Sequence, residues 1–146
     1  MKKLSELICG LCALIVMTGC ASTVQYVGFP DQTKMIEDSN KARIYVARPT
    51  IVGGAIPMNV IDGSNLIGRT GPKGYLCWER DPGKTELRGV AENVSTLTLN
   101  MEKGAVYYVQ QHVRFGFFIA GNKLRQMTED EGKKKVSKCK PPKVDY

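Results

Sequence analysis

Apolar and polar residues alternate along most of the chain after residue 41, a pattern typical of strands with one buried face. The clearest stretch covers residues 105–118. We expect one face of this stretch to enter the core, namely Tyr107, Val109, Val113, Phe115 and Phe117. Further strands are predicted over residues 42–48, 55–62, 66–69, 75–80, 85–90, 94–101 and 119–124.

Turn signals separate these strands at intervals of about 8–12 residues, as in sandwiches and barrels. Examples are Asp62-Gly63-Ser64-Asn65 and Asp81-Pro82-Gly83, where Gly and Pro supply the backbone angles of tight turns. No stretch between the strands is long enough for a crossover helix, which argues against a parallel βαβ sheet. The pattern therefore predicts an all-β fold, an antiparallel β-sandwich of about 7–8 strands.

The chain after residue 127 has a different pattern, which favours a short C-terminal helix. Thr128 is followed three residues later by Glu131, as in a capping box, and lysines come after the acidic first turn. Pro141-Pro142 ends the segment. A helix this short must dock on the sheet to be stable. The alternative is a hairpin that turns at Glu131-Gly132.

The N-terminus has the features of a secretory signal. Lys2 and Lys3 precede an apolar run over residues 7–17, which is too short to cross a bilayer as a helix. The run ends in Met17-Thr18-Gly19-Cys20, which resembles the lipobox of bacterial lipoproteins. That resemblance implies removal of residues 1–19 and lipidation of Cys20. A plain secreted protein or an uncut signal anchor is the alternative.

The same resemblance bears on location and domain organisation. In the sorting rule of such lipoproteins Asp after the cysteine favours the inner membrane, so Ala21 implies the periplasmic face of the outer membrane. Residues 20–41 lack periodicity and are predicted to be a lipid-anchored tether, with a short strand over 23–27 as the alternative. We expect the sandwich domain over residues 42–140 and a tail over 141–146.

A second resemblance covers roughly residues 40–138. The chain is similar to a family of bacterial lipoproteins with a domain of unknown function, and also to small β-sandwich modules named for a P-E-G-A motif. The similarity implies a fold and a location, but no activity and no catalytic residues. It is carried by Ala42-Arg43-Ile44-Tyr45-Val46-Ala47-Arg48-Pro49, Val60-Ile61-Asp62-Gly63, Ile67-Gly68, Gly74-Tyr75, Asp81-Pro82-Gly83, Lys103-Gly104 and Tyr107-Tyr108-Val109.

The positive charge of the chain indicates which kinds of partner it could bind. The 146 residues carry a net charge of +7, and removing residues 1–19 leaves 127 residues with +6. Six lysines and no acids lie within residues 133–143. Near a membrane each could attract anionic lipid by about 1 kcal/mol, and peptidoglycan or an envelope protein is another partner for such a segment. A solvated face is the alternative, and the expected compartment excludes nucleic acid.

Two cysteines remain in the mature chain after lipidation of Cys20. Cys9 and Cys12 leave with the signal, so their C-x-x-C spacing indicates no metal site. The oxidising compartment predicts a disulfide between Cys77 and Cys139, which would stabilise the fold by about 4 kcal/mol. Two unpaired thiols are the alternative. Together with the single His112, these cysteines match no zinc-site spacing.

The sequence also lacks an evident catalytic constellation. Cys77 and His112 have no third member to orient them, and no nucleophile elbow or phosphate-binding glycine motif is present. We therefore expect no enzyme and no cofactor.

A binding patch is the remaining candidate site. Trp78, Tyr108 and Phe118 fall on the strand faces opposite to the predicted core. The leading hypothesis is a non-catalytic interaction or structural module. The second hypothesis is a glycan- or small-ligand-binding module that uses this patch, and an enzyme inhibitor or enzyme comes last.

Overall fold

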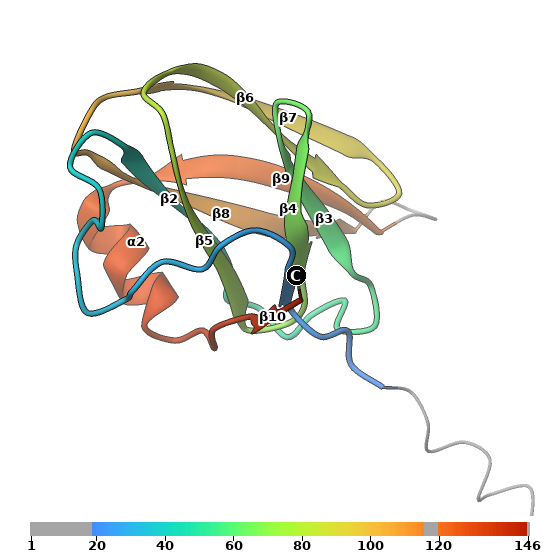
Figure 1. Ribbon diagram of the computed structural model, residues 1–146. Coiled ribbons are helices and arrows are strands. Elements are labelled where there is room, and N and C mark those ends of the chain that lie inside the picture. Colours follow the sequence, from blue (N-terminus) through green and yellow to red (C-terminus); the bar gives the residue numbers. More distant parts are fainter. Residues whose placement is uncertain (1–18, 116–119, 146) are drawn as a thin grey trace, which may run out of the picture.

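The computed structural model describes residues 19–115 and 120–145, and it confirms the β-sandwich with one short C-terminal helix. Two sheets face each other (Figure 1). The larger sheet has the strand order β10-β1-β4-β3-β6-β7 and the smaller one β5-β2-β8-β9. The elements are β1 (Val24–Gln25), β2 (Ala42–Arg48), β3 (Met58–Asp62), β4 (Asn65–Thr70), β5 (Gly74–Arg80), β6 (Gly83–Val90), β7 (Val94–Met101), β8 (Val106–Phe115), β9 (Ala120–Met127), α2 (Glu129–Val136) and β10 (Lys143–Val144).

Most neighbouring strands are antiparallel, as expected, but two pairs are parallel. β2 pairs with β8 in parallel, with Ile44 opposite Tyr107, and β1 pairs with β10. The chain between β2 and β8 supplies β5 to the same sheet and β3, β4, β6 and β7 to the opposite sheet. The return to β2 is thus made through a second sheet, which provides the long connection that a parallel pair needs.

The main core lies between the two sheets. Its buried side chains come from strands of both sheets, as the alternation in the sequence predicts. They are Ala42, Ile44, Val46, Val60, Ile67, Leu76, Trp78, Leu87, Leu99, Met101, Val109 and Leu124.

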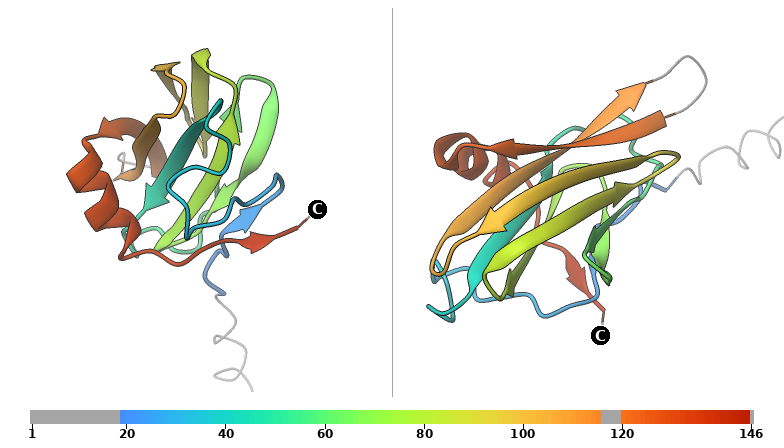
Figure 2. Two further views of the ribbon diagram at one scale, coloured as in Figure 1. Left: turned by 60° about the vertical axis from the view of Figure 1, so that its left-hand side comes forward. Right: turned by 90° about the horizontal axis from the view of Figure 1, so that it is seen from above.

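The four-stranded sheet is also buried on part of its outer face, over β5 and β2. A second cluster there contains Tyr75 and Cys77, with Val136 of α2 and Phe29 of the N-terminal segment packed on it. Figure 2 shows α2 lying on this outer side. β2 and β5 are covered on both faces, so β2 is buried at six of its seven positions, whereas Lys123 and Arg125 of β9 remain exposed.

The helix α2 confirms the C-terminal expectation over the alternative hairpin. The Thr128 hydroxyl accepts a hydrogen bond from the N–H of Glu131, at 3.4 Å. Gly132 is buried against Tyr108, and a Cβ on this glycine would lie 2.1 Å from Cγ of that ring. Gly132 therefore lowers helix propensity but lets α2 approach the sheet closely.

The expected tether over residues 20–41 is wrong, because this segment is part of the fold. β1 pairs with β4 and β10, as the alternative of a short strand over 23–27 anticipated. The buried Gln25 side chain donates to the carbonyl of Cys77 (2.7 Å) and accepts from its N–H (3.0 Å). Gln25 thus belongs to the larger sheet, and its side chain provides hydrogen-bond partners for the backbone of β5 at the edge of the smaller sheet. Such a contact requires the backbone of Gln25 to be held in place.

Candidate functional site

Cys20 is exposed and lies directly against the folded domain. The N–H of the next residue, Ala21, donates to the carbonyl of Gly54 at 2.8 Å. A Cβ on Gly54 would lie 3.8 Å from the Cys20 sulfur, which places the thiol beside the loop between β2 and β3. The domain therefore begins within one residue of the predicted lipidation site.

The loop beside Cys20 is held by a fully buried arginine at the end of β2. Arg48 donates to the carbonyls of Ile56 (2.6 Å), Gly53 (2.6 Å), Thr70 (3.2 Å) and Val52 (3.3 Å). Its Nε has no acceptor among the described residues. Burial lowers the pKa of Arg48, but a guanidinium stays charged in proteins, so this buried cation is balanced by carbonyl dipoles alone.

Three exposed lysines surround the same end of the sandwich. Lys73, Lys140 and Lys143 line, with residues 20–23, a shallow hollow of about 250 Å³ whose lining contains no carboxylate. Backbone hydrogen bonds fix their chain segments, since Lys140 donates to the carbonyl of Lys73 (2.7 Å) and Lys143 to that of Thr23 (3.0 Å). The lysines come from two distant parts of the sequence, and we call this surface, with Cys20, Ile51 and Val52, the Cys20 end.

A larger and more polar groove lies at the opposite end of the sandwich. It encloses about 690 Å³ between the segment 27–41, the turn joining β3 and β4, and the end of β5. Its lining mixes Phe29, Leu66 and Ile67 with charged groups of both signs. We call this the groove end.

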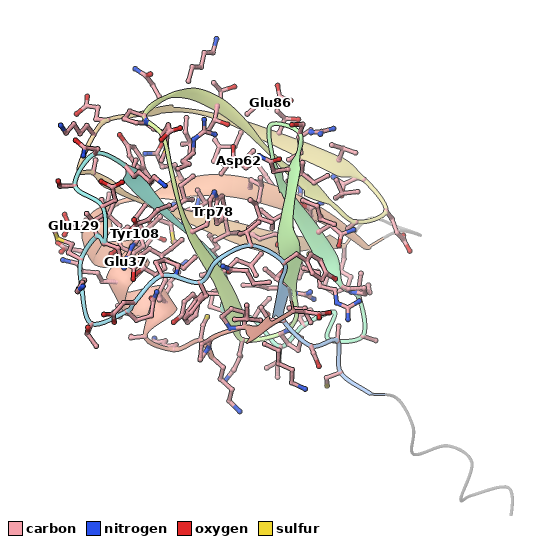
Figure 3. All side chains as sticks on the ribbon, in the orientation of Figure 1. Glu37, Asp62, Trp78, Glu86, Tyr108 and Glu129 are labelled. Carbon is pink, nitrogen blue, oxygen red and sulfur yellow. The ribbon has the colours of Figure 1, made fainter. Side chains whose placement is uncertain are left out.

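Asp62 organises one wall of the groove. Its carboxylate accepts hydrogen bonds from Trp78 Nε1 (2.9 Å), from the hydroxyl of Thr85 and from Arg80, with which it forms an ion pair. Figure 3 shows Asp62 and Trp78 together in the sandwich interior. The carboxylate has three donors within the protein, so it holds the wall together instead of presenting a free base.

Glu79 and Arg43 organise the other wall. The Glu79 carboxylate accepts from the backbone N–H groups of Glu37 (2.7 Å) and Asp38 (3.2 Å) and pairs with the buried Arg43 at 2.8 Å. Burial by itself would raise the pKa of Glu79, but these hydrogen bonds outweigh it and lower the pKa below its usual value. Arg43 also donates to the carbonyls of Asp31 and Lys34, which fastens the N-terminal segment to the sheet.

The predicted binding patch is not an exposed surface. Trp78 is only 3% exposed and belongs to the main core, and Tyr108 is 8% exposed beneath α2. Phe118 lies outside the described residues. The two-sided burial of the smaller sheet explains the error for Tyr108, while Phe115, predicted to be core, is 65% exposed at the far end of β8.

The two cysteines predicted to form a disulfide are both free thiols here. Lys140 bridges Gly74 of β5, and Cys77 lies three residues further along that strand, about 10 Å away. The bridge between Gly74 and Lys140 places Cys139 near the start of β5, and Cys139 packs against the outer cluster that contains Cys77 without a bond to it. Burial raises the pKa of both thiols to about 11.

His112 is also distant from Cys77. Tyr45 of β2 pairs with Cys77 on one side and Tyr108 on the other, and His112 lies four residues beyond Tyr108 along β8. Burial, and then the cations Arg125 and Lys135, lower the pKa of His112, and Glu131 opposes them only in part. Within residues 19–115 and 120–145 no group of three or more potential metal ligands occurs, and no helix is long and apolar enough to cross a membrane.

The residues that shape both ends were not identified from the sequence as site residues. Arg43 and Arg48 interrupt an otherwise apolar strand, and a charged residue inside a buried strand is a signal that it needs partners. Asp62 appeared only as a turn residue, because the sequence does not show that Trp78 and Thr85 converge on it.

No protein-family model matches the chain. An uncharacterised protein of Haemophilus influenzae (strain ATCC 51907 / DSM 11121 / KW20 / Rd) is 27% identical over 129 residues, which is 85% of this chain and 76% of that protein. The two chains are thus distant homologues over most of their length.

Proposed function

We propose that the protein is a lipoprotein attached through Cys20 to the periplasmic face of the outer membrane, where it acts as a non-catalytic interaction or structural module. The supporting observation is the position of Cys20, exposed and one residue before the first hydrogen-bonded residue of the domain. A processing site must be accessible, and a mature chain that begins at Cys20 keeps every strand and the helix described above. The lipobox and the similarity to lipoproteins with a domain of unknown function support the same proposal.

The chemistry of the polar groups favours a module without catalysis. The two most buried carboxylates of the groove already accept several hydrogen bonds within the protein. The two thiols have pKa values raised to about 11, so neither is a thiolate at neutral pH. The remaining candidate base, His112, accepts a hydrogen bond from Arg125 (3.4 Å), and among the described residues it has no hydrogen bond to a carboxylate.

The proposal is tested by expressing the full chain in a bacterium and separating membrane and soluble fractions. We expect the wild type in the outer membrane, with an N-terminal peptide that starts at Cys20 and carries acyl chains. Cys20→Ala should abolish acylation and processing, whereas the matched control Ser22→Ala should leave both unchanged. A mature N-terminus at any other residue would overturn the proposal.

A ligand-binding role is the second candidate, and the groove of about 690 Å³ favours it. Its mixture of apolar and charged side chains suits a small polar ligand such as a muropeptide or sugar. We expect such a ligand to raise the melting temperature of the wild type and not of Leu66→Glu in the groove. Val94→Glu, at a similarly exposed aliphatic residue away from the groove, should respond like the wild type. No thermal shift by any envelope glycan would exclude this role.

A further inference from the structure

We infer that the Cys20 end of the sandwich lies directly on an anionic bilayer, with Ile51 and Val52 at the level of the lipid headgroups and Lys73, Lys140 and Lys143 binding lipid phosphates. This rests on the proposed lipidation of Cys20. It adds an orientation and a lipid preference, which an acyl anchor alone does not supply.

Cys20 is joined to the folded chain without a free linker. Ala21 is hydrogen-bonded to Gly54, and Gly71 could not accept a Cβ because its position would lie 1.9 Å from the carbonyl oxygen of Ala21. One residue spans at most about 3.5 Å. A lipid attached at Cys20 therefore brings the loop between β2 and β3 to the membrane surface, which a tether of twenty residues would not do.

The loop between β2 and β3 has an apolar tip. Ile51 is 67% exposed and Val52 46%, side by side in a segment whose backbone Arg48 fixes. Adjacent exposed aliphatic side chains on a rigid loop lose water contact favourably when they enter the headgroup region. The position of the loop beside the Cys20 sulfur makes the bilayer the occupant of this surface.

The Cys20 end also carries a concentration of positive charge. Three exposed lysines surround the hollow at Cys20, whose lining has no carboxylate, and the buried Arg48 adds a cation that has no counter-ion within residues 19–115 and 120–145. The acidic residue nearest in sequence to these lysines is Asp145, two residues after Lys143. Its backbone N–H donates to the carbonyl of Gln25. Positive charge concentrated at the anchoring end is complementary to anionic phospholipid.

This orientation turns the groove away from the membrane. β5 runs from Gly74 at the Cys20 end to Arg80 at the groove, and β3 runs in the same sense from Met58 to Asp62. In Figure 1 β5 rises from the lower edge of the molecule, beside β10, toward the upper left. The groove is then open to the periplasm, available to a partner.

The first test places a fluorophore at each end of the full, processed protein. Ile51→Trp and the control Leu66→Trp, at the exposed start of β4, are reconstituted into phosphatidylcholine–phosphatidylglycerol vesicles that contain brominated lipid. Wild-type protein corrects for the buried Trp78. We expect strong quenching at position 51 and none at position 66, and equal quenching at both would overturn the orientation.

The second test measures the contribution of charge by labelling lysines with an amine-reactive reagent and mass spectrometry. Lys73, Lys140 and Lys143 should be labelled about fivefold more slowly with phosphatidylglycerol than with phosphatidylcholine alone, while Lys84 and Lys103 should not change. Equal labelling in both vesicles, or protection by peptidoglycan and not by lipid, would overturn the lipid assignment. A protein that no vesicle retains would instead refute the lipid anchor, so the two failures are distinguishable.

Discussion

The two ends of the sandwich each depend on a buried arginine from β2, but they balance its charge differently. At the groove end Arg43 is paired with Glu79 and also donates to backbone carbonyls. At the Cys20 end Arg48 donates only to carbonyls of the neighbouring loop and strand. The two residues are five positions apart in one strand and equally buried.

The difference shows how one strand can give two ends of a domain different electrostatic properties. The ion pair neutralises Arg43, and the groove around it carries charges of both signs. Arg48 leaves a net positive charge where three lysines already gather. We expect the groove end to respond to pH and to loss of its carboxylate, and the Cys20 end to respond to neither.

Arg48→Met is expected to lower the free energy of unfolding more than any other substitution considered below. The substitution would leave four carbonyls without their donor. A hydrogen bond to a charged donor contributes about 1.5–3 kcal/mol to stability, and water at the loop would replace part of what is lost. We expect a loss of about 4 kcal/mol in the free energy of unfolding, measured by urea titration. Arg48→Lys should rescue little of this, because one ammonium cannot reach all four carbonyls.

Arg43→Met should cost about 3 kcal/mol, because it leaves the Glu79 carboxylate without its counter-ion. The two backbone donors to Glu79 remain, which keeps the loss below that of Arg48→Met. Adding Glu79→Gln should recover about 1 kcal/mol in the Arg43→Met background and nothing in the Arg48→Met background. Equal behaviour in the two backgrounds would contradict the difference between the ends.

A smaller effect is expected from pH. The pKa of Glu79 is lower in the folded protein than its ordinary value of 4.5, so its stabilising contribution is present above that value and is lost as pH falls through the folded pKa. Glu79→Gln should therefore flatten the acid limb of stability against pH, measured by urea titration at each pH. Arg48→Met should keep the slope of the wild type. Glu131 also has a lowered pKa, about 2, but its ion pair is exposed and should be screened by salt.

The smallest effect concerns the thiols between the two ends. Cys139 is half-buried and Cys77 fully buried, and burial raises the pKa of both to about 11. In the processed protein, a thiol reagent at neutral pH should label Cys139 slowly and Cys77 only after unfolding. Unfolded, unreduced protein should give both thiols. If it gives none, the two cysteines form a disulfide, which contradicts the two free thiols.

The sequence predicted the strands and the C-terminal helix because alternation, turns and caps are local signals. Gly63 and Gly83 both have positive φ in the turns where they were expected. The orientation of Tyr108 was predicted wrongly because α2 covers the outer face of its sheet, and alternation cannot distinguish two buried faces. The exposure predicted for Trp78 was wrong for a related reason. Both faces of β5 are buried, so the alternation along this strand did not mark an exposed face.

The site was harder to predict because it depends on distant partners. No local pattern around Gln25 shows that its amide will satisfy Cys77, 52 residues later, so the first segment was expected to be a tether. Cys20 could be predicted as the lipidation site because signal processing depends on a contiguous motif. Its close contact with a lysine-lined surface required the fold.

The most direct test of the account is the intact mass of the native protein extracted from bacterial membranes, with sequencing of its N-terminal peptide by mass spectrometry. The account predicts a chain of residues 20–146 with a diacylglyceryl thioether on the Cys20 sulfur and an acyl group on its amine. A soluble chain that begins at another residue, or a chain with an unmodified Cys20 thiol, would contradict it.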